Sequence, residues 1–220
     1  ESAGNLLYAF SELAHLPKNK NGEYTLLEIP FAQYVKADID FAGNYVIDSR
    51  NSVAFHLAAG MAIPYGNADI IPFEKRYFSG GANSVRGWSA RTLGPGSYNA
   101  GTTIDYMKQS GDIKLDLNIE YRTKLVWLLE LAAFIDAGNI WTLKDEGQVG
   151  GQFKFDQFYK QIALSYGIGL RLNLDYFVIR LDWGIKAFDP SRGDGERWRF
   201  VPGWNILKDT ALHFAVGYPF

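Results

Sequence analysis

The 220-residue sequence contains no cysteine, which excludes disulfide bridges and thiolate metal sites and leaves the redox compartment open. It also has no excess of either charge, because 22 Lys and Arg stand against 24 Asp and Glu, for a formal net charge of -2. A nucleic-acid binder carries a basic stripe, and a disordered acidic segment carries excess negative charge. The balance argues against both classes.

Long apolar runs are missing as well. No stretch approaches the roughly 18 uninterrupted apolar residues of a membrane-spanning helix. Residues 1–10 lack the basic region, apolar core and cleavage site of an export signal. Asn5–Leu13 instead reads as a strand, so we expect the chain to begin within a fold, as a mature product or a piece of something longer.

The sequence is rich in glycine and aromatic residues, with 23 Gly, 6 Trp, 13 Tyr and 15 Phe, and apolar residues alternate with polar or small ones over long spans. Such alternation predicts strands. We predict three hairpins, the second with its turn at Thr123 and Lys124, followed by a terminal strand over residues 212–220. The paired segments are residues 31–47 with 53–63, 115–122 with 125–138, and 162–173 with 176–186. With Asn5–Leu13 as the first, this makes about eight strands.

The connections between these strands alternate between long and short. This asymmetry is typical of outer-membrane barrels, which have tight turns at one end and long loops at the other, whereas a soluble sandwich has no such bias. Charged residues lie on one face of the strands and would make a polar interior under an apolar coat. They are Lys36, Asp38, Asp40, Lys114, Asp116, Glu120, Glu130, Asp136, Arg171, Arg180 and Asp182. A soluble sandwich could also expose these charges to water, but the turn asymmetry favours the membrane.

The predicted fold class is therefore an all-β, antiparallel transmembrane β-barrel, formed as a single domain over residues 1–220. Unpaired strand edges are costly in hydrocarbon, so we expect the first strand to pair with the last and close the barrel. An eight-stranded lumen is too narrow for the whole loop of residues 64–110, so we expect only the tip of that loop to enter.

That loop contains a glycine-rich stretch, residues 75–88, in which Arg86 lies between Val85 and Gly87. Gly80, Gly81 and Gly87 permit tight turns and close backbone approach, and the Ser84 side chain can hydrogen-bond its own main chain. Arg86 therefore lies on an ordered tip. An ordinary surface loop with an exposed arginine is the alternative.

The segment Arg-Tyr-Phe-Ser-Gly-Gly-Ala-Asn-Ser-Val-Arg-Gly-Trp at residues 76–88 resembles the long-loop motif of the BamA and TamA superfamily of outer-membrane assembly factors. Glu120, the Phe-Ile-Asp-Ala-Gly segment around Asp136 and the terminal Phe220 match the family as well. The motif residues are Gly80, Gly81, Ser84, Val85, Arg86, Gly87 and Trp88. The resemblance covers the second half of the family's barrel, and the first half and the periplasmic POTRA domains have no counterpart here.

The resemblance implies that the long loop folds toward the lumen and that Arg86 contacts Glu120 and Asp136. Alternation independently places both carboxylates on the inward face. These contacts could form a functional latch, or could simply keep a wide lumen structured. A confined guanidinium can be held by two carboxylates, and removing one partner strands a charge.

The terminal strand resembles the signal by which assembly machinery grips its clients. Its seam residues are Phe214, Val216, Gly217, Tyr218 and Phe220. An apolar edge strand can pair with another strand by β-augmentation. Facing lipid is the alternative explanation for the same pattern.

As a family member, the chain would be part of an integral outer-membrane protein of a Gram-negative bacterium. It would insert or translocate client proteins without a cofactor. Its partners would be lipid, unfolded outer-membrane clients, POTRA domains and accessory assembly proteins, and no nucleic acid. A secretion pore for one partner and a passive small barrel are the alternatives.

A catalytic or metal site is not expected. His15, His56 and His213 are scattered without metal-ligand spacing, and no Ser, His and acid grouping supports a hydrolase. The Gly-Asp-Gly at residues 193–195 is better explained as a plain turn than as a cation-binding loop.

Overall fold

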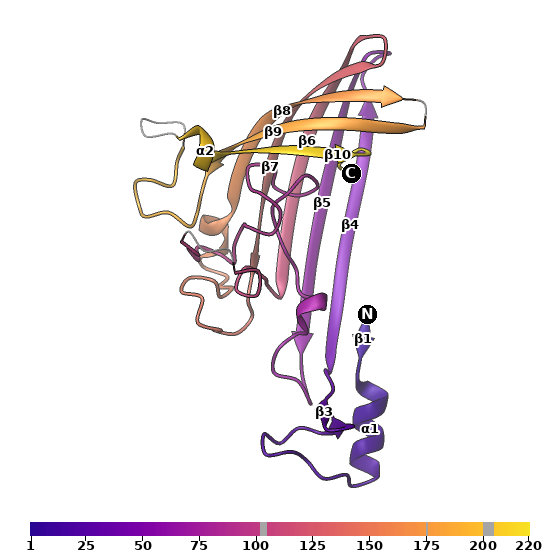
Figure 1. The fold of residues 1–220 in the computed structure, drawn as a ribbon, viewed down its shortest axis with the longest axis vertical. Coiled ribbons are helices and arrows are strands. Elements are labelled where there is room, and N and C mark those ends of the chain that lie inside the picture. The colour runs from indigo at the N-terminus through magenta and orange to yellow at the C-terminus, as the bar shows by residue number, and fades with distance from the viewer. Residues whose placement is uncertain (102–104, 175, 200–204) are drawn as a thin grey trace.

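The computed structural model describes residues 1–101, 105–174, 176–199 and 205–220. Its framework is an eight-stranded antiparallel sheet in the order β1-β4-β5-β6-β7-β8-β9-β10 (Figure 1). The strands of the sheet are β1 Ser2–Ala3, β4 Tyr34–Val46, β5 Asn51–Pro64, β6 Ile113–Val126, β7 Leu129–Trp141, β8 Ala163–Leu174, β9 Phe177–Phe188 and β10 Thr210–Val216. Outside the sheet lie α1 Asn5–Leu13, β2 Thr25–Leu26, β3 Ile29–Pro30, α2 Ile206–Asp209 and two 3-10 helices, Phe73–Lys75 and Phe158–Gln161. None of the described helices combines the length and apolarity needed to cross a membrane.

The three predicted hairpins are confirmed, because β4 pairs with β5, β6 with β7 and β8 with β9. The predicted turn at Thr123 and Lys124 is wrong. The second hairpin continues to the pair Val126↔Leu129, past a register irregularity after Lys124. Its turn contains Trp127, which has a positive φ of 55° and is 90% exposed. An aromatic residue therefore occupies the turn, where polar residues were expected.

The prediction of a strand over Asn5–Leu13 is also wrong, because this segment is the helix α1. It contains no β-branched residue, and Leu, Ala and Glu favour helix. Leu6, Phe10 and Leu13 recur at helical spacing. The first strand of the sheet is instead the two-residue β1, which pairs with β4.

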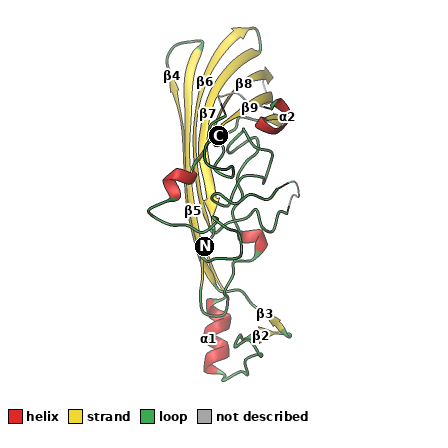
Figure 2. Ribbon diagram, turned by 90° about the vertical axis from the view of Figure 1, so that its left-hand side faces the viewer, coloured by secondary structure: helices red, strands yellow, loops and turns green. Residues whose placement is uncertain are grey.

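The terminal strand is shorter than predicted. β10 ends at Val216, and Gly217 follows with a φ of 94°, a left-handed conformation that glycine adopts without strain. In the described residues β10 pairs only with β9, and the sheet is open, so the closure predicted between first and last strands is not seen. The described parts of the segment 65–112 lie along one face of this open sheet (Figures 1 and 2).

The two faces of the sheet differ in chemistry. Isoleucines in the middle of the strands, such as Ile119, Ile135 and Ile168, are 58%, 62% and 52% exposed on the outer face. Charged side chains of the same strands are buried on the inner face: Asp116, Glu120, Glu130, Asp136, Arg171, Arg180 and Asp182. This is the reverse of the pattern in a water-soluble protein and suits an outer face in hydrocarbon over a polar interior.

If the outer face contacts hydrocarbon, an arginine there should be costly in a depth-dependent way. Ile135 lies midway along β7, and Val126 lies beside the turn. We expect Ile135→Arg to destabilise the folded protein in lipid vesicles by about 2–4 kcal/mol and Val126→Arg by about 0–1 kcal/mol. Urea titration of each variant in vesicles measures the difference. Two equally tolerated arginines would indicate that water covers this face.

Candidate functional site

The segment 65–112 presents its arginine through the local conformation of the motif. Gly80 and Gly81 have φ values of 90° and 103°, which side-chain-bearing residues rarely adopt. The Gly80 N–H donates to Ser84 Oγ at 3.3 Å and tightens the turn. Val85 and Trp88 on either side of Arg86 are buried in one apolar cluster with Leu93 and Ala163. The loop is therefore anchored immediately around Arg86.

Arg86 is held by two carboxylates of the sheet. Its Nε and Nη2 donate to the two oxygens of Asp136 at 2.9 and 2.8 Å. Its backbone N–H adds a bond of 3.0 Å to Asp136 Oδ2. Its Nη1 donates to Glu120. All three side chains are fully buried, so the loop arginine contacts both of the carboxylates predicted for it.

Two further arginines join Arg86 and its two carboxylates in a larger cluster of buried charges. Arg171 donates to Glu120 Oε2 at 2.9 Å and to Asp182. Arg180 donates to Asp182 Oδ2 at 3.0 Å and to the loop carbonyl of Ala82 at 2.8 Å. These side chains are at most 1% exposed. We call Arg86, Arg171, Arg180, Glu120, Asp136 and Asp182 the charge cluster, in which three positive charges match three negative ones.

Neighbouring side chains fit the loop to the wall. The ring of Phe134 lies 3.5 Å from the Arg86 guanidinium carbon, a cation–π contact. His213 Nε2 donates to the Arg86 carbonyl oxygen at 2.9 Å. A Cβ on Gly184 would lie 1.9 Å from that same oxygen, so only glycine allows the loop backbone to approach β9 this closely.

The predicted seam residues divide between two environments. Phe214 and Val216 on β10 are 71% and 64% exposed on the outer face. After Gly217 the chain turns inward, and the Phe220 ring stacks on His56 at 5.2 Å. The Tyr218 hydroxyl donates to Glu130 at 3.2 Å. The last residues therefore pack on the inner side and do not extend the edge strand.

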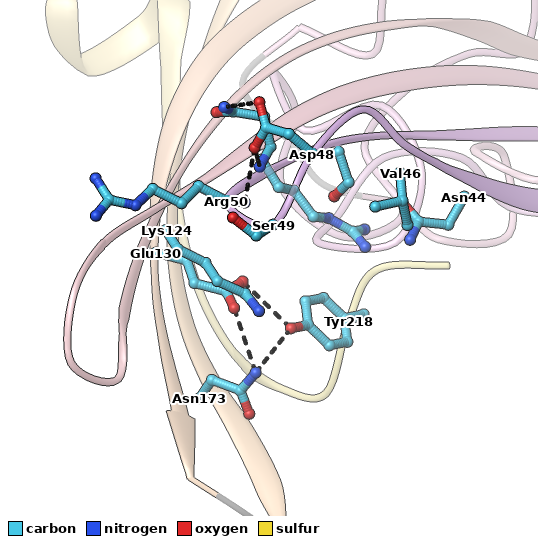
Figure 3. Close-up of a pocket in the computed structure, with 12 residues that line it drawn as sticks. Asn44, Val46, Asp48, Ser49, Arg50, Lys124, Glu130, Asn173 and Tyr218 are labelled. Carbon is cyan, nitrogen blue, oxygen red and sulfur yellow. Dashed lines mark hydrogen bonds between the residues drawn. The ribbon is translucent and has the colours of Figure 1, made fainter.

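Tyr218 lines a pocket of about 430 Å³ beside the short β4–β5 turn (Figure 3). Asn173 Nδ2 donates to Glu130 at 3.3 Å and to the Tyr218 hydroxyl at 3.2 Å. Arg122 also lines the pocket, with its guanidinium 4.5 Å from the Tyr218 ring. The last residues of the chain therefore contact polar side chains at the end of the sheet that carries the short turns.

A second set of ion pairs, centred on Asp209, lies just before β10. Asp209 accepts from Arg192, Arg199 and the Asn205 N–H, each at 2.7 Å. Burial opposes ionisation of this carboxyl, but the hydrogen bond from Arg199 and the other donors outweigh it and lower the pKa of Asp209 below its ordinary value. Asp209 therefore stays ionised and ties its loop to the start of the last strand.

Sequence reasoning placed Arg171, Arg180 and Asp182 on the inward face but did not join them to Arg86. The strand register reveals that they lie close together, because Arg171 is opposite Arg180 in the pairing of β8 with β9. The sequence favours an ordinary structural role for His213 over metal ligation, and the structure places its ring in contact with the loop backbone. Within the described ranges, no group of three or more His, Asp and Glu side chains could hold a metal ion.

Comparison with known families gives one match over most of the chain: the Omp85 superfamily domain matches residues 20–206. Two curated relatives are both outer membrane protein assembly factors BamA. The protein of Neisseria meningitidis serogroup B is 35% identical over 88 residues, which cover 37% of this chain and 11% of that protein. The protein of Nitratidesulfovibrio vulgaris is 24% identical over 203 residues, 90% of this chain and 22% of that protein. The chain thus spans less than a quarter of the length of either relative.

A solved structure has a similar fold. It is the crystal structure of BamA from Haemophilus ducreyi lacking POTRA domains 1-3, which matches with a TM-score of 0.57 and 16% identity. The match covers 84% of this chain and 35% of the solved chain. At this identity the likeness concerns the fold alone.

Removing Arg86 should release the loop from the wall. Arg86→Ala leaves Asp136 and Glu120 without their shared partner, and breaking a buried ion pair in this way costs about 3–5 kcal/mol. We expect a lower urea midpoint in vesicles and faster proteolysis within residues 65–112. Arg91→Ala is the matched control, because Arg91 lies on the same loop but is exposed.

The double variant Arg86→Ala/Asp136→Ala tests whether the two residues act together. It should lose less stability than the sum of the two single variants, because no unpaired Asp136 charge remains. Equal proteolysis of the Arg86→Ala and Arg91→Ala variants would show that the ion pairs do not hold the loop.

Proposed function

Because the chain belongs to the Omp85 superfamily, we propose that it forms part of the outer-membrane barrel of a factor that folds and inserts client proteins into that membrane. The two curated relatives carry the name of an assembly factor, and the apolar outer face with its polar inner face supports a place in a bilayer. Client folding and insertion belong to the whole protein, of which this chain supplies one side of the barrel.

The observation that carries the proposal is the edge of the sheet at β10. In the described residues β10 pairs on one side only, over seven register positions with β9. Its outward side chains Leu212, Phe214 and Val216 are 67%, 71% and 64% exposed. A short apolar strand with an unpaired edge is a template on which another strand can add by main-chain hydrogen bonds.

The charge cluster has a supporting role in this activity. It holds the segment 65–112 against the inner wall by bonds from Arg86 to β6 and β7 and from Arg180 of β9 to the Ala82 carbonyl. Arg171 of β8 bonds to β6 and β9 in turn. Ion pairs thereby link those strands, whereas β10 is joined to the loop by the hydrogen bond from His213 to the Arg86 carbonyl. We propose that this contrast keeps most of the wall intact while a client strand pairs at the seam. No cofactor or covalent step is needed for such an activity.

The proposal predicts where a client contacts the protein. With p-benzoylphenylalanine in place of Phe214 of the full-length protein in lipid vesicles, light should cross-link an unfolded outer-membrane client to position 214. The same amino acid in place of Tyr166 is the matched control, because Tyr166 is an aromatic residue on the outer face of β8, away from the edge. The unlabelled protein should also accelerate client folding, followed by heat-modifiable gel migration.

Different outcomes favour different functions. Equal cross-linking at positions 214 and 166 would contradict the seam. A protein that enters vesicles and leaves the rate of client folding unchanged would be a passive barrel. Release of a single partner into the vesicle lumen, without client insertion, would indicate a secretion pore.

A further inference from the structure

A groove of about 630 Å³ lies where β8 begins and β9 ends. Figure 1 shows these two strand ends at the end of the sheet away from the short turns. Its walls come from three places: the segment before β8, the facing ends of β8 and β9, and the segment before residue 199. The lining residues are Tyr159, Lys160, Ile162, Leu164, Phe188, Gly195, Arg197 and Trp198. None of them belongs to the charge cluster.

The groove opens on the outer face of the sheet. Leu164 has the same parity in β8 as the exposed Tyr166 and Ile168, whereas Ala163 and Ser165 are buried. A bulge in β9 makes Phe188 the partner of Leu164, and Lys186 the partner of Ser165. A bulge re-aims the side chains that follow it, so Phe188 joins Leu164 on the side that the proposed function places in lipid.

Trp198 completes the apolar wall. Its ring packs edge-on against Phe188, with centroids 4.9 Å apart. The backbone holds it there, because the Asp189 N–H donates to Arg197 O at 2.8 Å and the Arg199 N–H to Ala187 O at 2.9 Å. The segment thus lies beside the end of β9, bridged to it between Phe188 and Trp198, and forms one wall of the groove.

Two cationic side chains, Lys160 and Arg197, line this otherwise apolar groove. Within the part of the chain that the structure describes, Lys160 Nζ has no carboxylate partner, and it lies 5.6 Å from the Tyr159 ring. Arg197 Nη2 is 3.2 Å from Asp194, and its Nε donates to Arg192 O. The Asp194 side chain is 94% exposed, so water screens that pair. The groove therefore keeps positive charge to offer a ligand.

We propose that this groove binds a membrane lipid with an anionic phosphate headgroup, at the long-loop side of the bilayer. Leu164, Phe188 and Trp198 would contact the acyl chain, and Lys160 and Arg197 would bind the phosphate. Arginine suits phosphate through its planar fork of donors. A groove with apolar walls and cations beside it matches both parts of such a lipid, whereas free phosphate would leave the apolar walls unused.

This inference rests on the membrane location proposed above, and its test separates the two. The full-length protein, with p-benzoylphenylalanine in place of Tyr159, is reconstituted in phosphatidylcholine vesicles that contain a small fraction of phosphatidylglycerol. After illumination, mass spectrometry counts the cross-linked lipids. We expect phosphatidylglycerol to be enriched at position 159 over its share of the bilayer by on the order of tenfold.

The double variant Lys160→Gln/Arg197→Gln should bring this enrichment down to the share in the bilayer. Lys154→Gln is the matched control, because Lys154 is an exposed cation of the same loop outside the groove and should leave the enrichment unchanged. Client folding, measured in the same vesicles, reports the proposed function independently.

Three results would overturn the lipid site: no enrichment in the parent protein, enrichment that survives the double variant, or enrichment abolished by inorganic phosphate, which would make the site one for free phosphate. Any of these with normal client folding leaves the assembly function standing. A parent protein that neither enters vesicles nor folds clients counts against both proposals.

Discussion

The structure depends on the burial of equal numbers of opposite charges between the loop and the wall. A single buried guanidinium is costly, but Arg86 reaches Asp136 through three bonds and Glu120 through a fourth. Arg171 bridges Glu120 to Asp182, so each carboxylate has a cation and each cation has a carboxylate. Glu120 and Asp182 have cations on the wall itself, whereas Asp136 is paired in this cluster with the loop arginine. Arg86 and Asp136 therefore depend on each other, and through them the loop and the inner wall.

Small residues make this contact possible. The loop backbone lies against β9 only because Gly184 has no side chain at the Arg86 carbonyl. Gly167 does the same for Phe134, whose ring would lie 2.5 Å from an added Cβ. The Phe134 ring in turn covers the Arg86 guanidinium. These glycines weaken their strands locally, but they allow the charged loop to lie close against the wall.

The fold was predictable where one periodicity dominated and was missed where local patterns were short. Long alternating runs identified six strands and their pairing, because period two over ten or more residues has few competing explanations. The strand prediction for Asn5–Leu13 is wrong because a nine-residue segment has few periodic positions, and its composition without β-branched residues favours helix. The second turn is misplaced because polar residues mark turns more often than an aromatic such as Trp127 does. The inward position of Glu120 and Asp136 followed from alternation, but Arg86 was joined to them only by a family resemblance. Arg171 and Asp182 needed the strand register, which no local pattern specifies.

The end of the chain links the inner wall to the seam. β10 pairs with β9 over seven positions, from Thr210↔Ile185 to Val216↔Ile179. On the side of Gly217 the ladder ends at Val178, whose O accepts the Gly217 N–H at 2.7 Å. The residues that could have lengthened β10 pack inside instead, with Tyr218 on Glu130 and Phe220 on His56. In the β9–β10 register Tyr218 would lie opposite Phe177, the first residue of β9, so its inward turn ends the ladder one position early. Gly217 is thus the point at which the chain exchanges pairing in the sheet for contacts on the inner side of the wall.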